Sequence, residues 1–237
     1  MTSPAPRAIE PPDPRAVWGE LAGLLEFPRL LLRAPSLARA PRGSGLPVMV
    51  FPGFGTGDRS TAVLRRYLGF LGHDVHTWGL GRNHGNVEIL MPRLIEKVSR
   101  LAQRTGHPVR LVGWSLGGYL AREVSREIPG DVDRVVTLGS PVVGGPKYTL
   151  VARRYREKGI DLEAVEAAVD ARESVPLTRP VSAIYSRKDR VVAWQACVDE
   201  RNRCVEHIEV ASTHLGLGFS PDVLRIVAER LAGAAHP

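Results

Sequence analysis

The stretch Val109-Arg110-Leu111-Val112-Gly113-Trp114-Ser115-Leu116-Gly117-Gly118 decides the fold. Its first four residues form a mostly apolar run typical of a buried strand, and a helical pattern begins directly after Ser115. The serine matches the pattern Gly-x-Ser-x-Gly. In a tight turn from strand to helix, bulky side chains next to the serine would collide, which explains glycine at positions 113 and 117. Such a turn would expose the Ser115 hydroxyl above the edge of a sheet, at a helix N-terminus.

From residue 46 onward the chain alternates short apolar runs with longer helical patterns, as β-α-β units of a parallel sheet do. The near-continuous apolar content of the runs favours a sheet covered by helices on both faces. Strands are expected at residues 48–51, 75–78, 109–113, 132–138, 181–185 and 205–210. Helices are expected at residues 60–71, 87–104, 116–127, 191–198 and 221–231. The sequence therefore predicts an α/β fold with about six parallel strands.

The chain is expected to contain a short N-terminal part and one domain. Residues 1–45 are interpreted as a flexible proline-rich leader followed by a helical segment, and residues 46–237 as the domain. Within the domain, residues 141–179 are too many for a simple connection, because connections usually contain about four to six residues. Helical patterns occur near residues 148–158 and 162–171. We therefore expect this insertion to form a small helical cap over one end of the sheet.

The charge pattern argues against a nucleic-acid partner. The 237 residues carry a net charge of +7, but only four of the 32 basic residues are lysines, and the arginines are scattered without a nucleic-acid-binding motif. The one local cluster is Arg153, Arg154 and Arg156. This cluster is either a solvated helix face or a site that attracts acidic lipid surfaces or anionic substrates, so contact with a membrane surface stays open.

No metal, cofactor or membrane anchor is predicted. Two cysteines, Cys197 and Cys204, cannot form a structural zinc site alone, and we expect them to be unpaired thiols. No apolar run is long enough to cross a bilayer, and the N-terminus lacks the apolar core of a secretory signal. A cytoplasmic location is the resulting expectation.

Two later residues could activate the serine hydroxyl, which is a poor nucleophile without a base and an acid that orients the base. Asp189 follows the expected strand at 181–185, and His214 follows the expected strand at 205–210. Carboxyl ends of parallel strands share one edge of a sheet, so both should lie near Ser115. Asp131 precedes the strand expected at 132–138 and Asp133 lies at its start, so both belong at the opposite edge.

The segments 113–118, 185–189 and 212–216 together resemble the α/β-hydrolase family, in particular its lipase and esterase branch. The resemblance covers about residues 46–231. It implies the α/β-hydrolase fold, with Ser115 as the nucleophile, His214 as the general acid and base, and Asp189 as the orienting carboxylate. The pair of antiparallel strands that often begins this fold has no counterpart in the first 45 residues.

The resemblance also implies an oxyanion hole made of two backbone N–H groups, those of Leu116 and Phe54. Many relatives carry a His-Gly pair in the loop after the first parallel strand, where this chain has Pro52-Gly53. Three further side chains are candidate substrate contacts: Trp114, Trp194 and His84. The aromatic residues among them, and Phe54, could equally be part of the core.

The predicted reaction is hydrolysis of a carboxylic ester of a small molecule through an acyl-enzyme on Ser115. Four alternatives stay open. The same residues could transfer the acyl group to an alcohol or thiol, or could act on a thioester or a peptide. The fold can also serve as a binding module without catalysis.

Overall fold

A computed structural model of the chain describes residues 9–233. All six strands form one parallel sheet in the order β2-β1-β3-β4-β5-β6. The predicted α/β fold with six parallel strands is confirmed, with strand ends within one residue of those expected. The strands are β1 Pro47–Phe51, β2 Asp74–Thr77, β3 Val109–Trp114, β4 Val132–Leu138, β5 Val181–Tyr185 and β6 Val205–Glu209.

Helices connect the strands and precede the sheet. The α-helices are α1 Glu26–Leu37, α2 Ala62–Phe70, α3 Val87–Thr105, α4 Leu116–Glu127, α5 Ala152–Glu157, α6 Leu162–Arg172 and α7 Pro221–Ala232. The 3₁₀ segments are η1 Pro14–Leu25, η2 Asp58–Thr61, η3 Pro129–Asp131, η4 Gly145–Tyr148, η5 Trp194–Cys197 and η6 Gly216–Gly218. Among residues 9–233, none of these helices is long and apolar enough to cross a membrane.

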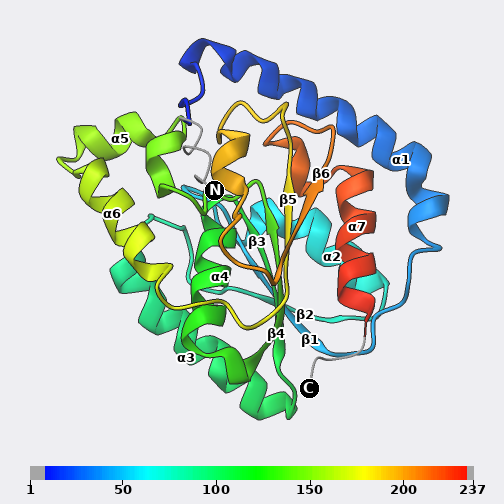
Figure 1. Cartoon of the computed structure of the whole chain (residues 1–237). Coiled ribbons are helices and arrows are strands. Elements are labelled where there is room, and N and C mark those ends of the chain that lie inside the picture. The colour runs from blue at the N-terminus through cyan, green and yellow to red at the C-terminus, as the bar shows by residue number, and fades with distance from the viewer. Residues whose placement is uncertain (1–8, 234–237) are drawn as a thin grey trace, which may run out of the picture.

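The sheet is covered on both faces, as Figure 1 shows. In β1, Met49 and Phe51 pack with α3 and α4 on one face, whereas Val48 and Val50 pack with α2 and α7 on the other. The alternation follows from the two-residue period of a strand, and the apolar stripes of the helices complete each core. Residues between β4 and β5 contain η4, α5 and α6, and Figure 1 shows α5 and α6 at one side of the molecule, to the left of α4.

The expected helix at 191–198 is wrong. This segment contains only the single turn η5, and Val192 forms an isolated antiparallel bridge with Thr149. Two hydrogen bonds extend this pairing, from Leu150 N–H to Val191 O at 2.8 Å and from Ala193 N–H to Tyr148 O at 3.0 Å. Tertiary pairing with the inserted segment therefore overrides the local helical pattern.

The N-terminal helix, formed by η1 and α1, lies across the end of the sheet above β5 and β6 (Figure 1). Phe27 stacks on Phe219 with ring centroids 4.4 Å apart, and Arg29 pairs with Asp222 at 2.8 Å. A Cβ atom at Gly23 would lie 2.5 Å from Thr213 Oγ1, so this glycine allows the helix to approach the loop after β6. Residues 1–8, part of the expected flexible leader, lie outside the described residues.

Several of the scattered arginines are structural. Arg122, on α4, is buried and contacts both Glu173 and Asp199 at 2.7 Å. Arg110 and Asp133 form another fully buried ion pair, at 2.8 Å. A buried charge is stable only when paired, so Arg122 and Arg110 hold three acids within the fold and do not form a surface site for polyanions.

We predict that Gly23→Ala loosens the N-terminal helix, because the added methyl group overlaps Thr213. The free energy of unfolding should fall by about 1–3 kcal/mol, the range for overpacked sites. Gly19→Ala on the same helix is the matched control, since its nearest neighbour would lie 3.7 Å away. The control should be neutral or stabilising by about 0.5–1 kcal/mol. Urea denaturation measures both, and equal losses in the two variants would contradict this packing.

Candidate active site

Ser115 occupies a strained turn between β3 and α4. Its backbone angles are φ 55° and ψ −125°, and it is the single residue other than glycine with positive φ within residues 9–233. Such a conformation costs about 1–3 kcal/mol and persists only where the surroundings enforce it. One such constraint is the hydrogen bond from Ser115 N–H to Leu138 O, at 2.8 Å. The strain is concentrated at the one residue that the sequence singles out.

The two glycines around Ser115 are required by close backbone contacts. A Cβ atom at Gly117 would lie 2.5 Å from Phe51 O and 2.6 Å from Pro52 O. A Cβ atom at Gly113 would overlap the backbone of Gly117. Because no real Cβ atom approaches backbone so closely, both positions exclude every other residue, as expected from the sequence.

Asp189 and His214 meet at the same edge of the sheet. His214 Nδ1 lies 2.6 Å from Asp189 Oδ2, and both side chains are buried. The other carboxylate oxygen, Oδ1, accepts hydrogen bonds from the N–H groups of Val191 and Val192, each at 2.8 Å. This arrangement fixes the carboxylate, so the carboxylate in turn fixes the imidazole ring. A Cβ atom at Gly139 would lie 3.0 Å from Asp189 Oδ2 and 3.0 Å from His214 Nδ1, so a larger residue at this position would crowd the pair.

The environment raises the pKa of His214 above its ordinary value. Burial alone lowers this pKa, because it disfavours the imidazolium. The negative charge of Asp189 and its hydrogen bond act in the opposite direction, and the charge of Glu20 adds to them. Together they outweigh the effect of burial, so the His214 ring stays protonated to higher pH than a histidine in water.

Glu20 was not anticipated from the sequence, yet it joins the segments that carry Asp189 and His214. Its Oε1 accepts the N–H of Arg190, and its Oε2 accepts the N–H of Leu215, both at 2.8 Å. Glu20 comes from η1 and is buried. One signal could have pointed to it: between residues 14 and 40, Glu20 and Glu26 are the only acids in an otherwise apolar and basic stretch.

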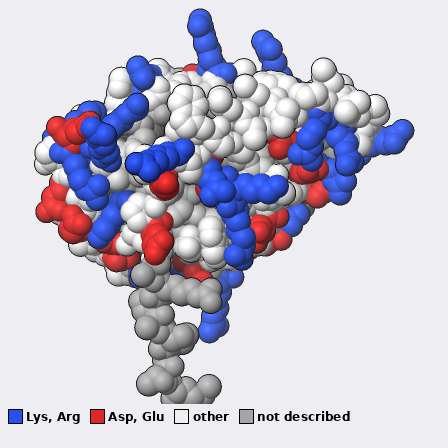
Figure 2. Space-filling model, turned by 90° about the horizontal axis from the view of Figure 1, so that it is seen from above, with Lys and Arg blue, Asp and Glu red and all other residues white. Residues whose placement is uncertain are grey.

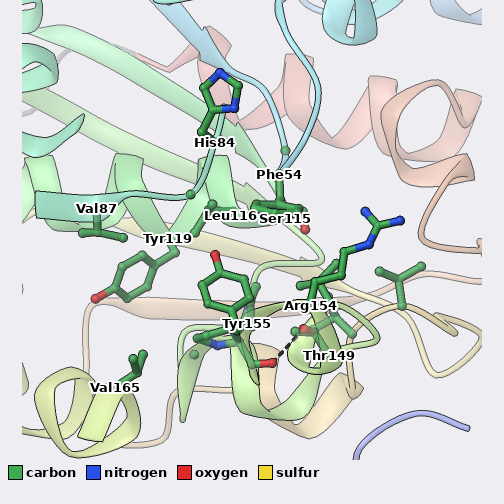
Figure 3. Close-up of a pocket in the computed structure, with 18 of the residues that line it drawn as sticks. Phe54, His84, Val87, Ser115, Leu116, Tyr119, Thr149, Arg154, Tyr155 and Val165 are labelled. Carbon is green, nitrogen blue, oxygen red and sulfur yellow. Dashed lines mark hydrogen bonds between the residues drawn. The ribbon is translucent and has the colours of Figure 1, made fainter. Parts of the chain in front are cut away.

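A cavity of about 1120 Å³ opens beside Ser115. Figure 3 shows Ser115 near its centre, with His84 and Phe54 on one side and Tyr155 and Arg154 of the inserted segment on the other. Six of the residues singled out from the sequence line it: Phe54, His84, Trp114, Ser115, Leu116 and His214. Asp189 does not line the cavity, because it lies behind His214.

The inserted segment forms one wall of this cavity. Tyr155 of α5 approaches Phe54, with ring centroids 5.7 Å apart, so the cap contacts the loop after β1. Arg154 also lines the cavity, whereas Arg153 is exposed and pairs with Glu157 at 2.7 Å. The arginine cluster noted in the sequence is therefore divided between the cavity and the surface. Tyr119 and Tyr155 are lining residues that the sequence did not suggest.

Trp194 is not brought to the cavity, which corrects its expected role in substrate binding. Its ring stacks on Tyr185 at 5.9 Å, and the guanidinium of Arg187 lies 4.2 Å from its centroid. Trp194 belongs to the turn η5, which follows the paired segment that replaces the expected helix. Trp114 does line the cavity, and its Nε1 donates to His214 O at 3.2 Å.

Leu116 follows Ser115 in the chain, and Phe54 follows Gly53, where an added Cβ atom would lie 3.3 Å from Ser115 Cβ. Leu116 is the first residue of α4, so its N–H has no acceptor within the helix. In the loop after β1, Gly55 N–H donates to Asn83 O and Thr56 N–H to Gly53 O, and no acceptor for Phe54 N–H is found within residues 9–233.

The part of the chain that the structure describes contains no group of three or more His, Cys, Asp or Glu arranged to hold a metal ion.

Comparisons with known proteins identify the fold. No family model matches the chain, and no curated protein matches its sequence. A structure from work on LipS and LipT, two metagenome-derived lipolytic enzymes, superposes with a TM-score of 0.60 at 15% identity, covering 81% of this chain and 93% of that one. A monoacylglycerol lipase of Paleococcus ferrophilus gives 0.58 at 16%, covering 81% and 96%.

A third match is the mouse α/β hydrolase domain-containing protein 10, with a TM-score of 0.55 at 18% identity, covering 80% of this chain and 90% of that one. The three proteins and this chain thus share most of their length and little of their sequence. This chain has the α/β-hydrolase fold.

Proposed function

We propose that the protein is a serine hydrolase that cleaves a carboxylic ester through an acyl-enzyme on Ser115. The observation that carries the proposal is the 2.6 Å contact between His214 and Asp189, beside a cavity that also contains a serine in a strained turn. A hydroxyl, an acid and a base in this order along the chain, Ser115, Asp189 and His214, are the components of a nucleophilic triad.

In the proposed reaction, His214 Nδ1 carries a proton and donates it to Asp189 in a hydrogen bond, which leaves Nε2 free to accept. Nε2 takes the Ser115 proton as Oγ attacks the ester carbonyl. The N–H groups of Leu116 and Phe54 stabilise the resulting oxyanion. The alcohol leaves with the proton from Nε2, and a water molecule then cleaves the acyl-enzyme by the same steps in reverse.

The cavity favours an apolar acyl group. Its walls include the aliphatic side chains of Val87 from α3, Leu116 from α4, and Val165 and Val169 from α6. A volume of about 1120 Å³ exceeds what a short acetyl group requires, and apolar pockets bind apolar chains through the hydrophobic effect. Thioester hydrolysis or acyl transfer would use the same residues, so a panel that pairs oxygen esters with thioesters, with and without an added alcohol, distinguishes these reactions.

We predict that Ser115→Ala abolishes turnover of p-nitrophenyl esters, because the variant has no nucleophile. Loss of a triad serine lowers kcat by about 10⁴-fold or more in well-studied enzymes. Hydrolysis is measured with acyl chains of increasing length, and thermal unfolding shows whether the variant is folded.

Ser140→Ala is the control for this measurement. Ser140 is a buried serine at the end of β4 that does not line the cavity. Its loss should change kcat only slightly. Unchanged hydrolysis by folded Ser115→Ala, or a loss confined to Ser140→Ala, would contradict the proposal.

The pH dependence should report the raised pKa of His214. Only the neutral ring accepts the serine proton, so activity should rise with pH through a midpoint above about 6.5, the ordinary value for histidine. The profile of kcat/KM between pH 5 and 9 measures this midpoint.

Glu20→Gln should move that midpoint to lower pH, because it removes a negative charge that favours the imidazolium. Glu26→Gln is the matched control, since Glu26 is also buried on the N-terminal helix but contacts Ser212 and Arg29. The control should leave the midpoint in place. Identical midpoints for Glu20→Gln and the wild type would show that Glu20 does not act on the base.

A further inference from the structure

The N-terminal helix exposes an unusual number of apolar side chains. Of the thirteen large hydrophobic residues exposed within residues 9–233, eight lie between positions 17 and 32. They are Val17, Trp18, Leu21, Leu24, Leu25, Phe27, Leu31 and Leu32, with exposures from 40% to 81%. A cluster of exposed apolar side chains of this size on a protein surface indicates an interaction site.

Most of these side chains lie on the outer side of the helix, whereas Phe27 stacks on Phe219 and Val17 lines the cavity. Trp18, Leu21 and Leu24 recur at the three-residue period of the 3₁₀ helix η1, and the strongly exposed Leu31 and Leu32 follow in α1. The opposite face is fixed to the molecule through buried Glu20, Gly23 and Glu26. The helix therefore cannot turn its apolar face inward without breaking the contacts of Glu20.

The exposed charges of the N-terminal helix have one sign, and an exposed carboxylate, Asp13, stands only at the cap that begins it. Between residues 14 and 40 both acids are buried, whereas Arg15, Arg33 and Arg39 are exposed. Figure 2, which views the molecule from above, shows a broad uncharged area with basic side chains projecting at its margin. A helix with exposed apolar residues whose own exposed charges are cations complements a lipid surface that carries negative charge.

We propose that the N-terminal helix docks the protein on an anionic lipid surface, with its outer face inserted in the headgroup region. Trp18 is suited to this position, because its ring combines an apolar body with a polar N–H. A helix lying in the plane of the interface buries its apolar face without spanning the bilayer. The docking does not require the proposed chemistry at Ser115.

The docked orientation places the cavity next to the lipid. Val17 of the N-terminal helix and Leu215 of the loop after β6 are exposed at the surface, and both also line the cavity. Glu20 of the N-terminal helix lines it as well. If the proposed ester hydrolysis holds, the substrate class that this geometry supplies is an apolar ester taken from a lipid layer.

Cosedimentation of the full chain with vesicles tests the proposal. One set contains equal parts of phosphatidylcholine and phosphatidylglycerol, and the other contains phosphatidylcholine alone. The wild type should bind the anionic vesicles more tightly, and the affinity should fall as salt is added. The triple variant Trp18→Ser, Leu21→Ser, Leu25→Ser should lose roughly 100-fold in affinity for the anionic vesicles.

The matched control is the double variant Phe70→Ser, Ile89→Ser, which removes apolar residues of similar exposure, 57% and 59%, from α2 and α3. It should bind as the wild type does. All substituted positions are exposed, and thermal unfolding verifies that each variant is folded. A second variant, Arg15→Gln with Arg33→Gln, should weaken binding to anionic vesicles by about tenfold or more and affect neutral vesicles little.

Three results would overturn the proposal. The first is no binding of the wild type to either vesicle. The second is an equal loss in the triple variant and its control. The third is a dimer in solution that the triple variant dissociates, measured by light scattering, because the apolar face would then be an interface between two copies of the chain.

Discussion

The strained backbone at Ser115 is the constraint on which the candidate site depends. The hydroxyl can stand at the end of the sheet only because β3 turns into α4 within one residue, and that turn is possible only with glycine at 113 and 117. The N–H of Ser115 is anchored to Leu138 in the neighbouring strand β4, so the sheet itself holds the turn. A conformation that costs about 1–3 kcal/mol is thereby maintained by the most buried part of the molecule.

The N-terminal helix contributes to the site from outside the sheet. Glu20 bonds to the segments after Asp189 and His214, so one carboxylate fixes the separation of the two loops and adds negative charge beside the imidazole. The outer face of the same helix is apolar and basic. The proposed chemistry and the proposed surface attachment thus share one element, and a change in how this helix packs should affect both.

The strands and the order of the candidate residues could be predicted because they depend on local patterns. Apolar runs define strands, and residues at strand ends gather at one edge, which places Asp189 and His214 together without knowledge of any contact. The helix expected at 191–198 was wrong, because Val192 pairs with Thr149. Thr149 lies far earlier in the sequence, and the local pattern around Val192 contains no information about such a partner. Glu20 lies 170 and 195 residues from its partners, so only the folded structure reveals its role.

The most direct test of the central claim is covalent labelling with a fluorophosphonate, followed by mass spectrometry of the peptides. A fluorophosphonate reacts with a serine only where a base activates it and an oxyanion site accepts the adduct. The account predicts one adduct, on Ser115, formed faster as the pH rises and absent in His214→Ala. An unlabelled protein, or an adduct on another serine, would contradict it.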